Sequence, residues 1–272
     1  MFISEKFVYI ALQKTGSNHI RQVLATLFEG EIVGKHRRAT PDLLKSGRTF
    51  IGSIRNPWEW YISLWAFGCD KEGRVYGQIM KSLANSPRPN PESPSSDDPS
   101  ALPQGRNSLG DKWKQCYSDV HNRSHFRDWL YLMHESVFGD DIVGGYGPSS
   151  VSQVCGLMTF RYMQLFCKNL AKPDFKTINS FDALKAREKG DCYINYFVHT
   201  EHLSQELIHA LESSGVVLTK KEKDLINATP PQNTSSRTKN ANYYYDKETI
   251  ELVYERERLI VDKFDYLPPS VS

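Results

Sequence analysis

The sequence predicts a single α/β domain in which helices cover both faces of a central parallel sheet. Strand-like apolar runs at 7–12, 31–34 and 49–55 alternate with helical patterns at 18–28 and 57–67. This β-α-β-α-β-α order is typical of parallel strands, because a crossover helix carries the chain back to the start of the next strand. The 272 residues fit one large α/β domain and are enough for a sizeable core.

The elements of the first quarter each carry their own signal. The run FVYIAL at 7–12 is continuously apolar, as expected for a buried strand, and EIVG at 31–34 is short and β-like. PDLLKSG at 41–47 predicts a short helix between a starting proline and a stopping glycine. TFIGSIR at 49–55 predicts the next strand. Apolar residues mark one face of the helix at 18–28, and these are Ile20, Val23, Leu24 and Leu27.

The alternation stops after residue 67. Residues 82–110 are rich in Pro, Ser, Asn, Gly and Asp, and predict a long loop or disordered insertion in the domain that spans 1–272. The rest of the chain is predicted as a helix around 126–133, a helix at 157–170, a strand at 193–200, a helix at 203–215, a loop at 233–246 and a helix at 247–264.

Composition excludes several classes of protein. The net charge of +2 gives no broad basic field, so the chain is not predicted to bind nucleic acid. The five cysteines are odd in number and lack CxxC spacing, which disfavours a disulfide framework and a zinc site. No run of apolar residues reaches the length of about 18 that a membrane span requires. Residues 1–12 lack the pattern of a signal peptide, so a cytoplasmic protein is expected.

The stretch LQKTGSNHI at 12–20 has the parts of an anion-binding turn between a strand and a helix. Free N–H groups and the helix dipole favour a negative charge at a helix N-terminus. Gly16 allows a close approach of the backbone, Thr15 and Ser17 offer hydroxyl groups, and Lys14 adds a full charge. The same letters also fit a plain strand-to-helix turn. They do not form a Walker A motif, because the lysine precedes the glycine.

A second stretch, SIRNPWEWYISLW at 53–65, offers another pair of phosphate ligands. Arg55 follows a predicted strand, Pro57 starts a helix, and Ser63 lies about two turns into it. Arg55 and Ser63 are therefore predicted to bind one phosphate from two sides. Taken alone, Arg55 would equally suit a surface ion pair.

Together the two stretches resemble the superfamily of sulfotransferases that use 3′-phosphoadenosine 5′-phosphosulfate (PAPS) as donor. QKTGSN is similar to that family's 5′-phosphosulfate loop, and RNPWEWYISLW is similar to its 3′-phosphate motif. FVHTEHLSQEL at 197–207 is similar to a further strand and helix of the family. Residues 233–266 look like the C-terminal loop and helix of its carbohydrate and bacterial branches. Gln13, Asn18 and Leu64-Trp65 depart from the usual pattern, and residues 68–125 match no part of it.

The resemblance implies a P-loop-like three-layer fold and a set of roles. Lys14 would stabilise the leaving group in catalysis. The 5′-phosphate would be bound by Lys14, Thr15, Gly16, Ser17 and Asn18, and the 3′-phosphate by Arg55 and Ser63. The family requires no metal, and the sequence shows no cluster of metal ligands. Such transfer needs a cation and N–H donors at the leaving group and a base for the acceptor hydroxyl.

His36 in VGKHRRAT is the predicted base, because it follows the short second strand and the carboxyl ends of neighbouring strands meet at a ligand crevice. It alternatively belongs to a basic loop that binds anions, with Lys35, Arg37 and Arg38. The rival bases are His19, His121, His125, His199, His202 and Glu59. A basic, hydroxyl-rich loop near the C-terminus is expected to cover the donor, through Ser235, Ser236, Arg237 and Lys239. Trp58 and Phe160 are candidates for the adenine wall.

The predicted function is sulfuryl transfer to an acceptor hydroxyl, with a sugar as the first guess. A phenol, a small or lipid-linked alcohol and a peptide tyrosine stay open, as does the oligomeric state. A kinase with a degenerate phosphate loop and a non-catalytic protein that binds PAPS are the alternatives. Residues 82–110 are predicted to shape the acceptor cleft, because they follow the donor-binding helix.

Overall fold

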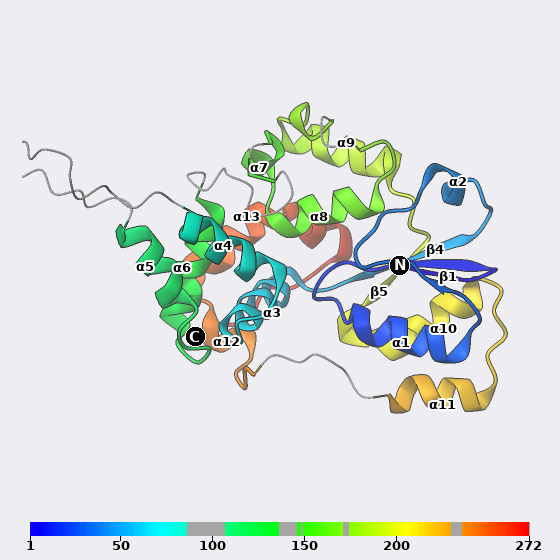
Figure 1. Cartoon of the computed structure of the whole chain (residues 1–272). Coiled ribbons are helices and arrows are strands. Elements are labelled where there is room, and N and C mark those ends of the chain that lie inside the picture. Colours follow the sequence, from blue (N-terminus) through cyan, green and yellow to red (C-terminus); the bar gives the residue numbers. More distant parts are fainter. Residues whose placement is uncertain (86–106, 136–145, 148, 171–173, 230–235, 272) are drawn as a thin grey trace, which may run out of the picture.

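A computed structural model describes residues 1–85, 107–135, 146–147, 149–170, 174–229 and 236–271 of the chain (Figure 1). These residues form one α/β domain with a five-stranded sheet among many helices. The strands are β1 (Phe2–Ile3), β2 (Phe7–Ile10), β3 (Glu31–Ile32), β4 (Thr49–Ile54) and β5 (Tyr196–His199). Their order across the sheet is β3-β1-β2-β4-β5.

The sheet is mixed, so the prediction of an all-parallel sheet is wrong in part. The strands β2, β4 and β5 are parallel, with Tyr9 opposite Ile51 and Ile51 opposite Tyr196. Strand β1 runs antiparallel to both β2 and β3, and lies between them. The two-residue strand β1 is too short to show a period, and a tight turn closed by the Ser4 N–H bond to the Phe7 carbonyl reverses the chain into β2.

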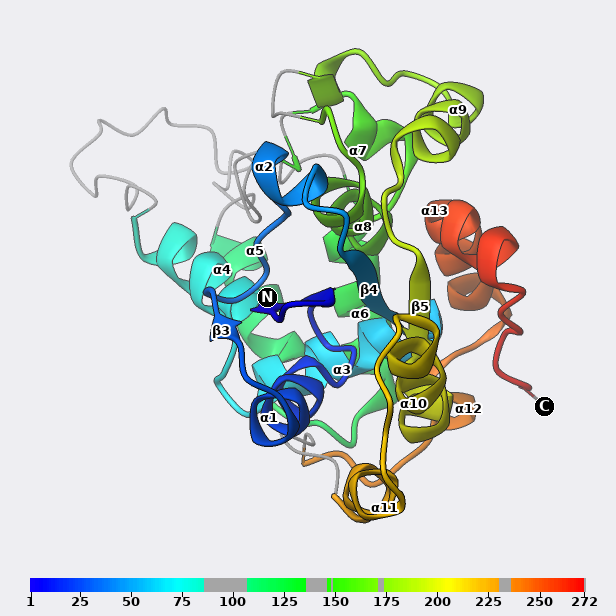
Figure 2. The ribbon, with the colours of Figure 1, turned by 90° about the vertical axis from the view of Figure 1, so that its right-hand side faces the viewer.

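Two separate hydrophobic clusters cover the two faces of the sheet. Alternate residues of β2 contribute to different clusters: Phe7 and Tyr9 to one, and Val8 and Ile10 to the other. The cluster of Phe7 and Tyr9 includes α1, α10 and α11, which lie together on one side of the sheet in both views (Figures 1 and 2). The opposite cluster is larger and includes most of the remaining helices. The expected helical cover of both faces is therefore present.

Helices occur where the sequence predicts them, with small shifts of their ends. These helices are α1 (Ser17–Leu27), α2 (Pro41–Leu44), α3 (Pro57–Cys69), α6 (Arg123–His134), α8 (Leu157–Phe166), α10 (Leu203–Ser213) and α13 (Lys247–Phe264). The helices without a sequence prediction are α4 (Arg74–Asn85), α5 (Asn107–Cys116), α7 (Val151–Val154), α9 (Phe181–Asp191), α11 (Lys220–Ala228) and α12 (Ala241–Tyr244). No helix in the described ranges is long and apolar enough to cross a membrane.

Helical structure occupies both ends of the segment 82–110 that was predicted as a loop. Helix α4 continues to Asn85, and α5 begins at Asn107. Residues 86–106 lie outside the described ranges, so the role of this segment at the acceptor cleft stays a prediction. Within 233–246, predicted as a loop, α12 forms one short turn of helix, because the aromatic side chain of Tyr244 is buried against Trp65 and Phe126.

A buried carboxylate joins the C-terminal helix to α8. No side chain of its own caps α8, and Glu257 of α13 instead accepts hydrogen bonds from the N–H groups of Met158 (3.0 Å) and Thr159 (2.7 Å). The hydroxyls of Thr159 and Tyr61 donate to the same carboxylate. Glu257 is fully buried, so these donors offset the cost of removing its charge from water. This contact fixes α8 and α13 relative to α3.

Candidate functional site

The candidate site begins at the turn between β2 and α1, where the backbone adopts a left-handed conformation twice. Lys14 has φ 61° and Gly16 has φ 68°. Turns of this kind point successive N–H groups toward one concave side, which suits an anion. Gly16 is also the N-cap of α1, which has neither a side-chain cap nor an acidic residue in its first turn. The N-terminus of α1 therefore keeps its positive end available to a ligand.

The side chains in this turn divide into those that hold it and those that remain for a ligand. The Thr15 hydroxyl donates to the Leu12 carbonyl (2.8 Å) and lies 2.6 Å from the Ser53 hydroxyl of β4. In this structure the Thr15 hydroxyl fixes the turn, and its role as a phosphate ligand stays a prediction. Asn18 accepts from Arg21 at 2.6 Å, and Ser17 is 8% exposed.

Arg55 links the turn to α3. It follows β4, and its guanidinium donates to the Lys14 carbonyl at 3.2 Å and to the Glu59 carboxylate at 3.1 Å. Parallel pairing of β2 with β4 brings their carboxyl ends together, which explains why residues 41 positions apart meet. The structure therefore places two predicted phosphate ligands, Lys14 and Arg55, side by side.

Helix α3 presents a row of side chains to this region. Glu59, Ser63 and Phe67 are spaced four residues apart, so they lie on one face of the helix. At one end Glu59 pairs with Arg55, and at the other the Lys14 ammonium lies 3.7 Å from the centre of the Phe67 ring. Ser63 lies between Glu59 and Phe67 on this face, and its role as a phosphate ligand stays a prediction. The contact of Lys14 with Phe67 is a cation–π interaction.

The segment that follows residue 235 docks on the same helix. The Arg237 guanidinium contacts the Glu59 carboxylate at 2.5 Å, and the Ser236 hydroxyl and N–H donate to Asp70. Lys239 instead points its ammonium toward the Tyr243 ring, 5.8 Å from the centre. Ser235 lies outside the described residues. The structure thus brings Ser236 and Arg237 to the predicted site and directs Lys239 elsewhere.

The site is electropositive and partly removed from water. Burial, the largest cause, and the neighbouring charges of Arg55 and Arg237 together lower the pKa of Lys14 to about 8, while Asp70 opposes them. Burial also lowers the pKa of Arg55. Within the described residues, Nη1 of Arg237 is enclosed and has no hydrogen-bond partner. An anion placed among these groups would supply the missing acceptor and relieve the repulsion between the cations.

His36 contacts the backbone where β2 ends. Its Nδ1 is 2.9 Å from the carbonyl of Ala11, the residue that directly follows β2. A carbonyl can only accept, so Nδ1 carries the proton and Nε2 keeps a free lone pair. Burial lowers the pKa of His36 to about 4, so the ring is neutral at pH 7. His36 therefore has the tautomer that a general base requires, close to the first loop as predicted.

The rival bases have other surroundings. His19 is buried within α1. The His199 ring contacts Glu206 at 2.8 Å, and His125 lies 3.3 Å from the Ser118 hydroxyl. His121 and His202 are exposed.

The two candidates for the adenine wall are core residues. Trp58 is 1% exposed and donates to the Ile250 carbonyl at 3.2 Å. The Phe160 ring packs against Phe175 with 4.8 Å between centres. Neither ring can contact adenine unless the core rearranges.

Sequence reasoning missed three residues of the site or assigned them differently. The sequence assigns no role to Phe67 or Asp70, and it offers Glu59 only as a rival base. The spacing of Glu59, Ser63 and Phe67 along one helical face was a signal that could have found Phe67. No sequence signal connects Glu59 with Arg237, which is 178 positions away.

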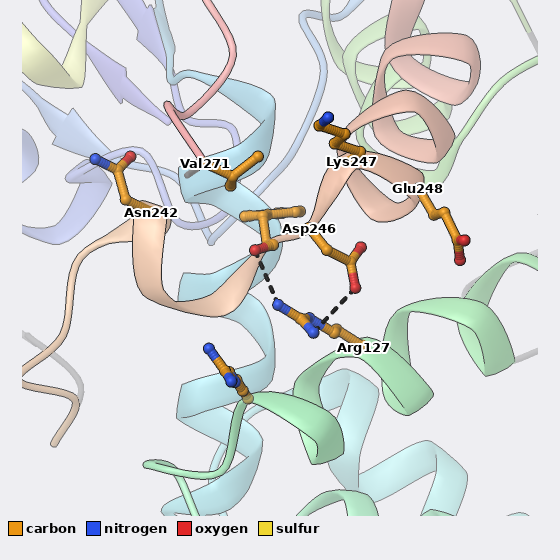
Figure 3. Close-up of a pocket in the computed structure, with 8 residues that line it drawn as sticks. Arg127, Asn242, Asp246, Lys247, Glu248 and Val271 are labelled. Carbon is orange, nitrogen blue, oxygen red and sulfur yellow. Dashed lines mark hydrogen bonds and ion pairs between the residues drawn. The ribbon is translucent and has the colours of Figure 1, made fainter.

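A separate pocket of about 390 Å³ lies between α6, α12 and α13 (Figure 3). It contains none of the predicted site residues. Arg127 in its wall donates to the carbonyls of Tyr244 (2.8 Å) and Tyr245 (2.9 Å) and pairs with Asp246 at 3.0 Å. The charge of Arg127 is thus already used to hold α6 against the start of α13.

Comparison of the chain with models of protein families, with curated proteins and with solved structures finds no match.

Proposed function

We propose that the protein is a sulfotransferase that moves a sulfuryl group from PAPS to an acceptor hydroxyl, with a sugar as the first candidate acceptor. The observation that carries this proposal is the convergence of Lys14, Arg55 and Arg237 at the uncapped N-terminus of α1. These three residues come from three separate parts of the chain. A P-loop-like fold of three layers belongs to the same proposal and is supported by the helical cover of both sheet faces.

The residues present fit a donor that carries two phosphate groups. The N–H groups of Gly16 to Asn18 would bind the 5′-phosphate, with Lys14 beside them. Arg55, Ser63 and Arg237 would bind the 3′-phosphate. The enclosed Nη1 of Arg237, which lacks a partner in the described part of the chain, supports this assignment. Glu59 forms ion pairs with both Arg55 and Arg237, and so orients both guanidinium groups.

The donor would supply the reactive sulfuryl group. During transfer the acceptor oxygen bonds to sulfur, the bond from sulfur to the phosphate oxygen breaks, and negative charge grows on that oxygen. The Lys14 ammonium and the N–H groups of the turn would stabilise this charge. Nε2 of His36 would take the proton of the acceptor hydroxyl. The low pKa of the free imidazole would rise beside a bound anion, which strengthens it as a base when the donor is present.

Calorimetric titration with adenosine 3′,5′-bisphosphate in the absence of magnesium tests the donor site. We expect micromolar binding, and no comparable binding of ATP with magnesium. Preference for ATP with magnesium would favour the kinase alternative. Transfer of a radiolabelled sulfuryl group to a panel of sugars then separates an enzyme from a non-catalytic binding protein. Bisphosphate binding without transfer to any hydroxyl acceptor would favour the latter.

A further inference from the structure

Cys167 and Cys192 are free thiols that the proposed mechanism does not use. Cys167 directly follows α8 and Cys192 directly follows α9, and the backbone of both is extended. The N–H of the residue after each cysteine donates to the carbonyl of the residue before the other, at 2.8 and 3.0 Å. The two cysteines are therefore directly opposite one another in an isolated antiparallel bridge.

The hydrogen-bond pattern of this bridge brings the two side chains close together. The cysteines exchange no backbone hydrogen bond with each other, because the bonds are made by their neighbours. In an antiparallel pair of this kind the Cα atoms are about 4.5 Å apart and both side chains lie on the same side. A disulfide joins residues whose Cα atoms are about 4.4–6.8 Å apart. The backbone thus already places the two thiols within reach of a sulfur–sulfur bond.

The two thiols differ in their access to solvent. Cys167 is fully buried, whereas Cys192 is half-buried and its sulfur lies 3.5 Å from the Tyr162 hydroxyl. A hydrogen bond from the Cys167 thiol is the largest cause that lowers the pKa of Cys192, and burial opposes it. An accessible thiol that ionises readily beside a second cysteine is the arrangement of a redox-sensitive pair. Cys192 is therefore the thiol that meets an oxidant first.

The bridge also supports the loop that carries His36. The Arg38 guanidinium donates to the carbonyl of Cys167 itself at 3.2 Å. From the other segment of the bridge, the Tyr193 hydroxyl accepts a hydrogen bond from the N–H of Ala39 at 3.2 Å. A covalent bond between the two cysteines would therefore tie together both segments on which this loop rests.

We propose that Cys167 and Cys192 form a reversible disulfide when a peroxide oxidises the protein. The Cys192 thiolate attacks one peroxide oxygen, so that an S–O bond forms, the O–O bond breaks, and the other oxygen takes up a proton and leaves as water. The Cys167 sulfur then attacks the sulfenic sulfur of Cys192. An S–S bond forms, the S–O bond breaks, and hydroxide leaves with the Cys167 proton as water. Two thiols and one hydrogen peroxide thus give one disulfide and two waters.

The test is peptide mapping of the full chain after reaction with hydrogen peroxide and alkylation of the remaining thiols. We expect the number of free thiols to fall by two from five, and the tryptic peptides 162–168 and 190–220 to become linked. Dithiothreitol should reverse both changes. Cys69→Ser is the matched control, because Cys69 is also half-buried. Burial is the largest of the causes that raise the pKa of Cys69 to about 12, so its removal should leave the link intact.

A second variant separates the two chemical steps. Cys167→Ser should form no linked peptide, and its Cys192 should still be oxidised to a sulfenic acid that dimedone labels. Cys192→Ser should give neither the link nor the label.

Absence of the linked peptides in the oxidised native protein would overturn the inference. The same mixture of cysteine pairs in buffer and in concentrated urea would also overturn it, because folding would then not be what brings these thiols together. Both results come from the native chain, so a folding defect in a variant cannot produce them. Neither involves adenosine 3′,5′-bisphosphate, so a failure of the proposed function would leave this inference standing.

Discussion

At the scale of single residues, the site depends on charges held in a partly dry environment. Lys14 is the clearest case, because burial and its cationic neighbours bring its pKa down to about 8 from 10.5. An ammonium with this pKa is charged at pH 7 and gains from an anionic ligand. Ligand binding, and a change of pH within the range where proteins are stable, would therefore both change the protonation of Lys14.

The pKa of Lys14 predicts how affinity for adenosine 3′,5′-bisphosphate depends on pH. The free protein loses the Lys14 charge as pH rises through about 8, so binding should weaken between pH 7.5 and 9.5. The full loss should approach tenfold, roughly the value of one charge-assisted hydrogen bond. Calorimetry at several pH values measures it. Lys14→Arg cannot lose its charge and should show a flat profile; an equal decline in that variant would assign the effect to another group.

Gly16 should tolerate no side chain. Its φ of 68° is unfavourable for other residues, and an added Cβ would lie 2.7 Å from Cδ1 of Leu203. We expect Gly16→Ala to lower the free energy of unfolding by about 1–2 kcal/mol and to weaken bisphosphate binding. Gly77→Ala in α4 is a matched control, because an added Cβ there meets nothing within 4 Å. That control should stabilise by about 0.5–1 kcal/mol. Equal effects at both glycines, in urea denaturation, would contradict this account.

At the scale of elements, helix α8 depends on a residue of α13. Glu257→Ala removes the acceptor of the Met158 and Thr159 N–H groups and leaves them buried. The free energy of unfolding should fall by about 3 kcal/mol or more. Chemical denaturation measures the change, with Glu255→Ala on the exposed face of α13 as control. A loss below about 0.5 kcal/mol, the size expected for a surface change, would show that α8 needs no such cap.

The segment 236–239 should contribute to donor binding through one of its two cations. Arg237 reaches Glu59 beside Arg55, whereas Lys239 faces Tyr243. We therefore expect Arg237→Ala to weaken bisphosphate binding by about tenfold or more, and Lys239→Ala to change it little. Both variants remove one positive charge, so a general electrostatic effect would reduce affinity equally in the two. That outcome, seen by calorimetry, would contradict a direct role for Arg237.

At the scale of the whole molecule, the strands and helices that local patterns determine were predictable from the sequence. The run FVYI of β2 and the proline-led start of α3 are local signals, and both elements form where expected. Strand β1 has two residues and no period to detect, so the antiparallel pairing was missed. The convergence of Lys14 with Arg55 was predictable, because parallel neighbouring strands end at the same edge of the sheet.

Other parts of the site follow from contacts between distant segments. The docking of Arg237 on Glu59 depends on how the segment after residue 235 packs against α3. No spacing rule in the sequence predicts it. The hydroxyl of Thr15 fits a phosphate ligand by its position in the motif, yet it bonds to Leu12 and Ser53 because the turn itself must be held.

The most direct test of the account compares adenosine 3′,5′-bisphosphate with adenosine 5′-phosphate by calorimetry, in the native protein and in Arg55→Ala. The account predicts that the native protein prefers the bisphosphate by about tenfold or more, because the 3′-phosphate reaches Arg55. Arg55→Ala should lose this preference while its affinity for the 5′-phosphate stays nearly constant. Equal binding of both nucleotides by the native protein, or a preference that survives in Arg55→Ala, would contradict a donor site built on these residues.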